Sequence, residues 1–147
     1  MTIRPMTVRD EPAVAALYAL CHPTWTARPA RFYTADNQTL LAVLGDLVLG
    51  YAVLGTSPAG AILHDSGVHP DWRGKGLAGL LHTARLEAAS SRGDEFAIGF
   101  TWAGNTPMVR LLARLGFVQT LVHDGFFPEN DPPADALVYV KRLRPAG

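Results

Sequence analysis

Hydrophobic residues occur along this chain in two patterns: short apolar runs, and longer stretches whose apolar positions lie three or four residues apart. The short runs are bounded by Gly, Pro, Asp or Ser, which is typical of β-strands separated by turns. The longer stretches are typical of helices with one buried face. Strands are expected over residues 2–5, 39–44, 47–56, 61–68, 96–101, 117–123 and 137–142. Helices are expected after Thr7, Gly76 and Asn105, with a further short helix inside 21–37 and a long loop over 124–135.

This order of elements predicts an α/β fold. Hairpins are expected at Gly45-Asp46 and across 57–60, where turn residues separate apolar runs. Gly67, inside a strand, indicates a bulge or a close backbone approach. A central pair of strands joined by a helix, with hairpins on either side, predicts a mixed sheet with helices on both faces. The length is that of a single domain, residues 1–147.

The same spacing predicts which helix positions are buried. His82 is expected at the surface of the second helix, and Gly116 is expected to end the third as the glycine after its last turn. The apolar positions expected in the core are Ala13, Val14, Ala16, Leu17, Leu20, Leu77, Leu80, Leu81, Ala84, Ala88, Met108, Leu111, Leu112 and Leu115.

The junction between the strand at 61–68 and the following helix carries the strongest chemical signal. Pro70 cannot donate to a strand ladder, so it ends the strand. Gly74 and Gly76 permit a tight turn and a close approach of backbone to ligand. The turn leads into a helix N-terminus, whose unpaired N–H groups and positive dipole end favour anions. With Arg73 and Lys75 at its rim, the junction predicts a phosphate-binding loop.

Three interpretations of this loop compete. The first is a glycine-rich turn without a ligand. The second is a dinucleotide site, since Gly74, Gly76 and Gly79 spell G-x-G-x-x-G; however, Asp94 and Glu95 precede the next strand, the wrong end for a ribose contact. A P-loop is excluded because no Gly-Lys-Ser/Thr follows. The third interpretation is a family resemblance.

The segment from Val68 to Ala78, with Arg73-Gly74-Lys75-Gly76-Leu77-Ala78 at its centre, resembles the Arg-x-x-Gly-x-Gly/Ala acetyl-CoA signature of the GNAT superfamily of N-acetyltransferases. A helix that begins at Asn105 and ends in Arg114-Leu115-Gly116-Phe117 is similar to the second half of that family's pattern. The resemblance covers nearly the whole chain. It implies a mostly antiparallel twisted sheet of about seven strands.

The resemblance also implies a cofactor and its site. Acetyl-CoA is the expected cosubstrate, with its diphosphate held by the main chain of Arg73, Gly74, Lys75, Gly76, Leu77 and Ala78, and with Asn105 in the second motif. A bulge is expected to splay the central strand from its neighbour. Pantetheine then fits between them like an added strand and hydrogen-bonds to backbone near Val68. A backbone N–H near this residue is expected to hold the thioester oxygen as charge develops.

The expected acceptor is a primary amine, on a small molecule or a peptide. Trp25, Phe32 and Phe126 are candidates for the acceptor site, and each is equally a candidate for closing the edge of the core. The segment 123–128 followed by 135–137 is similar to a Tyr-Tyr-Pro…Asp-Ala segment of the ribosomal-protein N-terminal acetyltransferases, with Phe in place of both Tyr. Members of the family are often homodimers.

The catalytic side chains are not all present. The family's thiol-protonating Tyr position is occupied by Leu112, and the Glu base of the ribosomal-protein acetyltransferases by Phe100. A thiol of pKa about 8.5 leaves without much help, so these departures weaken catalysis without removing it. His64, expected on the same strand face as Ser66 and Val68, is a candidate base or water positioner, or a hydrogen-bonded core histidine. A CoA-binding module with impaired catalysis is the alternative function.

Composition narrows the partners. The 13 basic and 13 acidic residues balance, which gives no reason to expect a nucleic acid or an anionic membrane. No apolar run approaches the roughly 20 residues of a membrane span, and no signal peptide is evident. The single Cys21 excludes an intrachain disulfide and fits a reducing compartment, so a cytoplasmic protein is expected. With five scattered histidines and one cysteine, no metal is expected.

Overall fold

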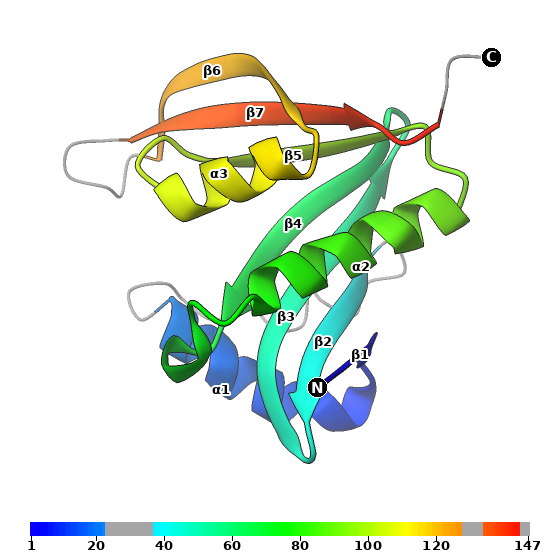
Figure 1. Ribbon diagram of the computed structural model, residues 1–147, viewed down its shortest axis with the longest axis vertical. Helices are drawn as coiled ribbons and strands as arrows, with labels where there is room; N and C mark the ends of the chain where they lie inside the picture. The colour runs from blue at the N-terminus through cyan, green and yellow to red at the C-terminus, as the bar shows by residue number, and fades with distance from the viewer. Residues whose placement is uncertain (23–36, 128–133, 145–147) are drawn as a thin grey trace.

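The computed structural model describes residues 1–22, 37–127 and 134–144 of the chain, and their strands form one seven-stranded mixed sheet in the order β1-β2-β3-β4-β5-β7-β6 (Figure 1). All neighbouring strands are antiparallel except β4 and β5. The mixed, mostly antiparallel sheet predicted from the sequence is therefore confirmed. The strands are β1 Thr2–Pro5, β2 Gln38–Leu44, β3 Leu47–Ser57, β4 Gly60–Val68, β5 Phe96–Trp102, β6 Val118–Phe127 and β7 Ala134–Arg142. The helices are η1 Val8–Asp10, α1 Glu11–Cys21, η3 Pro70–Trp72, α2 Leu77–Ser91 and α3 Thr106–Arg114.

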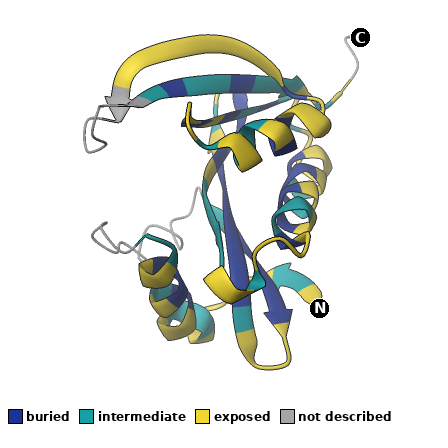
Figure 2. Cartoon of the chain, turned by 60° about the vertical axis from the view of Figure 1, so that its left-hand side comes forward, coloured by how far each residue is buried: buried dark blue, intermediate teal, exposed yellow. Residues whose placement is uncertain are grey.

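Alternation along the strands divides the core between the two faces of the sheet (Figure 2). Leu41 and Tyr51 pack with Val14 and Leu17 of α1 on one side, here called the α1 face. The α2 face carries the other strand positions, and its two clusters include Ala42, Leu49 and Ala52 with Leu77 and Leu81, and Ala61 and Leu63 with Leu86 and Leu112. Side chains at successive strand positions point to opposite faces, so β2 and β3 contribute to the core on both sides of the sheet.

The parallel contact between β4 and β5 is short. It pairs only Ala61–Leu63 with Ala97–Gly99, after which the two strands separate. One step further, the register of β4 against β3 shifts from Leu54↔Leu63 to Ala52↔Ser66, so β4 contains one extra residue opposite Val53. This β-bulge bends the strand. It follows that β4 keeps an open edge beyond Leu63, inside the sheet.

Most boundaries agree with the sequence predictions. The two hairpins close at Gly45-Asp46 and Pro58-Ala59, and β4 stops before Pro70. Asn105 caps α3 by accepting a hydrogen bond from the Met108 amide, and Gly116, with φ +87°, follows the helix end. The loop predicted over 124–135 is wrong at both ends, because β6 continues to Phe127 and β7 begins at Ala134. The short helix expected inside 21–37 falls largely outside the described residues.

Two predicted helix faces are rotated. In α1, Leu20 is 52% exposed and Tyr18, not Leu20, joins Val14 and Leu17 in the core. In α2, Leu80 is 51% exposed, and the predicted surface residue His82 is buried at 2% exposure. In each helix, a buried residue directly follows a predicted core residue: Tyr18 follows Leu17 in α1, and His82 follows Leu81 in α2. Spacing alone gives the period of a buried stripe but leaves its centre open by about one residue when apolar residues flank it.

Of the two features expected at Gly67, a bulge or a close backbone approach, the structure shows the second. The bulge lies at His64 and Asp65, so the glycine does not form it. A Cβ at Gly67 would instead lie 2.8 Å from Cys21 Sγ and 2.8 Å from Tyr51 Cε1, both on the α1 face. The close-approach alternative is therefore confirmed, because α1 ends directly against this backbone. No described helix is long and apolar enough to cross a membrane.

An ion pair at the N-terminus leads to a pH prediction. Arg4 donates two hydrogen bonds of 2.8 Å to the Asp10 carboxylate, which also accepts from the Thr7 amide. These bonds, the arginine's first, hold the pKa of Asp10 well below its usual range. A lowered folded-state pKa stabilises the fold above the unfolded-state value, about 3.9, and this contribution is lost as pH falls below it. The difference in Tm between wild type and Asp10→Asn is expected to be present at pH 7 and to shrink at pH 3. A difference that grows on acidification contradicts this assignment.

Candidate active site

The glycine-rich loop forms an open cradle at the start of α2. Gly74 and Gly76 have φ of +76° and +85°, and α2 begins directly after Gly76. The backbone amides of residues 76–79 donate to no other residue in the part of the chain that the structure describes. A Cβ built at either glycine meets no atom within 4 Å. Four adjacent donors at the positive end of a helix, facing open space, are suited to a phosphate group.

The two cations of the loop take different positions. Arg73 folds back, and its Nε donates to the Val68 carbonyl at 3.1 Å. Lys75 Nζ lies 5.8 Å from the centroid of the Trp72 ring. Trp72 packs against the Leu77 cluster beneath the loop. The arginine therefore fixes the loop to the end of β4, with the rest of its exposed guanidinium beside the cradle.

A cavity of about 610 Å³ extends from this cradle between the end of β4 and α3. Its lining comes from the loop, the first turns of α2, the end of β4 and the N-terminal half of α3. Val68 and Asn105 both line it, as does Arg114 at the far end of α3. The structure thus brings together the predicted cofactor positions Val68, Arg73, Gly74, Gly76, Leu77, Ala78 and Asn105 around one cavity. The remaining predicted position, Lys75, lies in the same loop.

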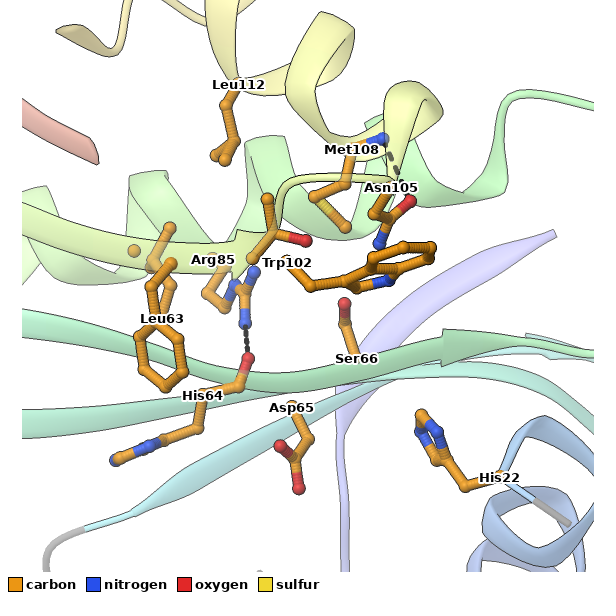
Figure 3. Close-up of a pocket in the computed structure, with 13 residues that line it drawn as sticks. His22, Leu63, His64, Asp65, Ser66, Arg85, Trp102, Asn105, Met108 and Leu112 are labelled. Carbon is orange, nitrogen blue, oxygen red and sulfur yellow. Dashed lines mark hydrogen bonds between the residues drawn. The ribbon is translucent and has the colours of Figure 1, made fainter. Parts of the chain in front are cut away.

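A smaller cavity of about 260 Å³ continues along the gap toward the point where β4 and β5 part (Figure 3). The two cavities share four lining residues, His22, Ser66, Asn105 and Met108. Ser66 points into the gap from β4, and Trp102 faces it from β5. A ligand that enters from the cradle can therefore reach the smaller cavity along the open edge of β4.

The bulge changes where His64 points. Leu63 and Ser66 both face α2, since their partners on β3, Leu54 and Ala52, do. His64 and Asp65 point to the opposite side of β4, as Figure 3 shows, and the His64 ring lies over Gly55. The prediction that His64 shares a face with Ser66 is wrong, because one inserted residue inverts the alternation. His64 still lines the smaller cavity.

The two positions where the sequence departs from the family pattern bear apolar side chains near the gap. Leu112 is 3% exposed and lines the smaller cavity from α3. Phe100 is 46% exposed at the same cavity. Neither can carry a proton. Trp25 and Phe32 lie outside the described residues, and so does the side chain of Phe126, whose backbone belongs to β6.

Three polar residues of this region were not predicted. His22 caps the end of α1, its Nε2 lies 2.9 Å from the Tyr51 hydroxyl, and it lines both cavities. Arg85 lines the smaller cavity and His82 the larger one, both from the buried side of α2. His82 and Arg85 lie among apolar residues of α2, but helical spacing alone does not show that they face the sheet. His22 follows a helix end, and only tertiary structure brings it to the gap.

Burial dominates the electrostatics of these groups. It lowers the pKa of Arg85 to about 9, so the guanidinium remains charged at neutral pH. Burial, and then the neighbouring Arg85 charge, lower the pKa of His82 well below 6.5, so this imidazole is neutral. Burial raises the pKa of the Cys21 thiol, with Arg73 opposing the shift. The described residues contain no group of three or more His, Cys, Asp or Glu side chains suited to a metal.

The fold and this site define a class of α/β protein in which an anion-binding cradle at a helix start opens onto the gap between two splayed strands. The sequence matches the acetyltransferase (GNAT) family over residues 8–117, and the chain therefore belongs to the GNAT family of acetyltransferases. The class of enzyme and the fold predicted from the sequence are both confirmed. Among curated proteins, none matches the chain.

Solved structures share the fold at low sequence identity. The ribosomal-protein-S18-alanine N-acetyltransferase of Escherichia coli superposes with a TM-score of 0.89 at 20% identity, over 99% of this chain and 96% of that one. A ribosomal-protein-alanine N-acetyltransferase from Brucella melitensis gives 0.84 at 23% identity, over 97% and 99%. A GNAT acetyltransferase from Elizabethkingia anophelis with acetyl-CoA bound gives 0.80 at 20% identity, over 96% and 97%.

Proposed function

We propose that this protein transfers an acetyl group from acetyl-CoA to a primary amine by direct attack. The observation that carries the proposal is the continuity of the amide cradle at residues 76–79 with the gap between β4 and β5. A structural relative named as having acetyl-CoA bound supports the choice of cosubstrate. The lone Cys21, which forms no disulfide, supports a reducing, cytoplasmic setting.

The proposed cofactor site follows the cavities from end to end. The diphosphate lies on the amides that follow Gly76, with the Arg73 and Lys75 charges at the rim. The pantetheine arm runs along the open edge of β4 past Val68, where its amides take the place of a neighbouring strand. The thioester then lies in the smaller cavity, where a backbone N–H of the open edge holds its oxygen.

The acceptor approaches from the α1 face in this proposal. His22, His64 and Asp65 line the smaller cavity from that side of β4. The amine nitrogen attacks the thioester carbonyl, a C–N bond forms, and the C–S bond breaks. The amine proton passes to a histidine or through water, and CoA leaves as a thiolate that takes its proton from solvent. The last step fits the apolar Leu112 wall, which offers no acid.

A CoA-binding module with impaired catalysis is a second candidate, favoured by Leu112 and Phe100 at positions where a proton carrier is expected. Both functions require CoA binding, and only the enzyme releases free thiol from acetyl-CoA when an amine is present. A thiol-release screen over peptide N-termini, polyamines and amino acids separates them. Amine-dependent thiol release supports the transferase. Calorimetric binding of CoA without release for any acceptor supports the module, and binding of NAD in place of CoA contradicts both.

The two histidines of the α1 face provide a test of proton transfer. His64→Ala and His22→Ala are each compared with His123→Ala, an exposed position on β6. The variant that removes the base is expected to lose roughly 10²- to 10⁴-fold in kcat, and the limb of the pH–rate profile that reports its ionisation. Unchanged turnover in His64→Ala rejects the role proposed for that residue from the sequence. Unchanged turnover in both assigns proton removal to solvent.

A further inference from the structure

A polar pair occupies the buried side of α2, where the helix lies on the sheet. His82 and Arg85 are 2% and 3% exposed, between the core residues Leu81, Leu86 and Ala89. The Nη2 atom of Arg85 lies 2.6 Å from Nδ1 of His82. Arginine only donates, so Nδ1 accepts, and a neutral imidazole then carries its proton on Nε2. The pair therefore has one defined orientation.

Arg85 bonds to both strands at the bulge. Its Nη1 donates to the Val53 carbonyl at 2.9 Å and to the His64 carbonyl at 3.0 Å. Val53 is the β3 residue opposite the extra residue of β4, and His64 begins the bulge. A bulge interrupts the ladder between two strands. The guanidinium therefore links β3 and β4 at the place where the register shifts; Figure 3 shows its bond to His64.

This arrangement is costly for stability alone. Arg85 makes no ion pair with a carboxylate among the described residues, and its Nε has no hydrogen-bond partner there. His82 Nε2 is likewise buried without a partner in the described part of the chain. A buried charge without a counter-ion is unfavourable, and an apolar side chain of similar volume is often at least as stable. What this unfavourable burial maintains is the pair of hydrogen bonds from Arg85 to the strands at the bulge.

The position of the bulge gives these bonds a role in the cleft. It lies directly after the last β4–β5 pair, Leu63 with Gly99, where the open edge of β4 begins. Arg85 and Ser66 line the same cavity as Leu112. We propose that Arg85, oriented by His82, is a positioning residue for acetyl transfer: it fixes the bulge and so sets the direction of the open β4 edge on which the thioester lies. This inference rests on the proposed function.

The first test is Arg85→Met, which keeps the volume and removes the donors. The kcat for acetyl transfer is expected to fall by about 10- to 100-fold, because small displacements of reacting groups have effects of this size. The Kd for CoA, measured by calorimetry, is expected to stay within about threefold, since the cradle at the N-terminus of α2 is unchanged. Leu86→Ala, at a buried position on the same helix, is the control: it lowers Tm and leaves kcat unchanged.

A second pair of variants applies if Arg85→Met does not fold. His82→Asn keeps an acceptor near the place of Nδ1, whereas His82→Leu removes it. Asn is expected to keep kcat within about twofold of wild type and Leu to lose about three- to tenfold. Equal kcat values for the two variants overturn the proposal, as does an Arg85→Met protein with wild-type kcat.

Hydrogen exchange measured by mass spectrometry tests the role of Arg85 without knowledge of the amine substrate. Peptides that cover residues 62–66 are expected to exchange at least about tenfold faster in Arg85→Met than in wild type, while peptides of β6 and β7 do not change. Unchanged exchange at 62–66 overturns the positioning role. A wild-type protein that acetylates no amine contradicts the proposed function instead, and the exchange comparison still decides whether Arg85 holds the bulge.

Discussion

Gly76→Asp is expected to weaken CoA binding by about 100-fold or more. The substitution places a carboxylate at the entrance to α2, where the diphosphate is proposed to lie, and like charges about 4–5 Å apart repel by a few kcal/mol at an effective dielectric constant near 20. It also places a side chain at φ +85°, which costs about 1–2 kcal/mol of stability in a residue with a Cβ. The first effect acts on binding and the second on the fold.

Gly93→Asp separates these two effects. Gly93 also has φ +85°, and a Cβ there also meets nothing within 4 Å, but it follows the opposite end of α2. Both variants are expected to have a lower Tm, Gly93→Asp by more because its carboxylate lies at the negative end of α2, and only Gly76→Asp to lose affinity for CoA by calorimetry. Gly76→Ala adds backbone strain without charge, and its affinity for CoA is expected to lie between those of wild type and Gly76→Asp. Equal CoA affinity in the two aspartate variants would show that the anion binds elsewhere.

Gly67→Ala is expected to destabilise the fold by about 2 kcal/mol, because the added Cβ overlaps a buried ring and a thiol. Tyr51 is fully buried and cannot turn away without disturbing Val14 and Leu17, which pack around it. The end of α1 or the open edge of β4 has to move. For a chain of this length the change corresponds to about 4–8 °C in Tm.

Gly99→Ala is the matched control in the neighbouring strand. A Cβ at Gly99 comes no closer than 3.4 Å to any atom, an ordinary contact with Leu63. Thermal unfolding of the two variants, followed by circular dichroism, is expected to show a lower Tm for Gly67→Ala alone. A Gly99→Ala variant that is equally destabilised would attribute the effect to alanine in a strand of this sheet rather than to contact with α1.

The strands and their turns could be predicted because their signals are local. Gly45-Asp46 and the segment 57–60 interrupt apolar runs, and Pro70 cannot continue a ladder, so each boundary is encoded within a few residues. The phosphate-binding loop is local in the same sense. Two glycines and a helix start make a cradle from backbone alone, whatever the rest of the chain does.

Features that depend on contacts between distant segments could not be read from the sequence. Nothing in the apolar run around His64 marks an inserted residue, and the insertion inverts the face of every position before it relative to those after it. Likewise, the buried side of α2 depends on which ridge of the helix meets β3 and β4. The sequence therefore predicts His82 at the surface, and it carries no signal that His22 reaches the gap from the end of α1.

The three residue pairs between β4 and β5 divide β4 into two parts whose amides differ in protection from hydrogen exchange. Amides of Ala61–Leu63 lie within the ladder, whereas those a few residues later lie on an edge that no β5 residue covers. Opening of the later part needs no disruption of the sheet on that side, so it belongs to the low-energy fluctuations of the native state. A ligand bound along this edge would suppress those fluctuations and link the two halves of the sheet. Ligand binding would therefore make the molecule more rigid where β4 and β5 separate.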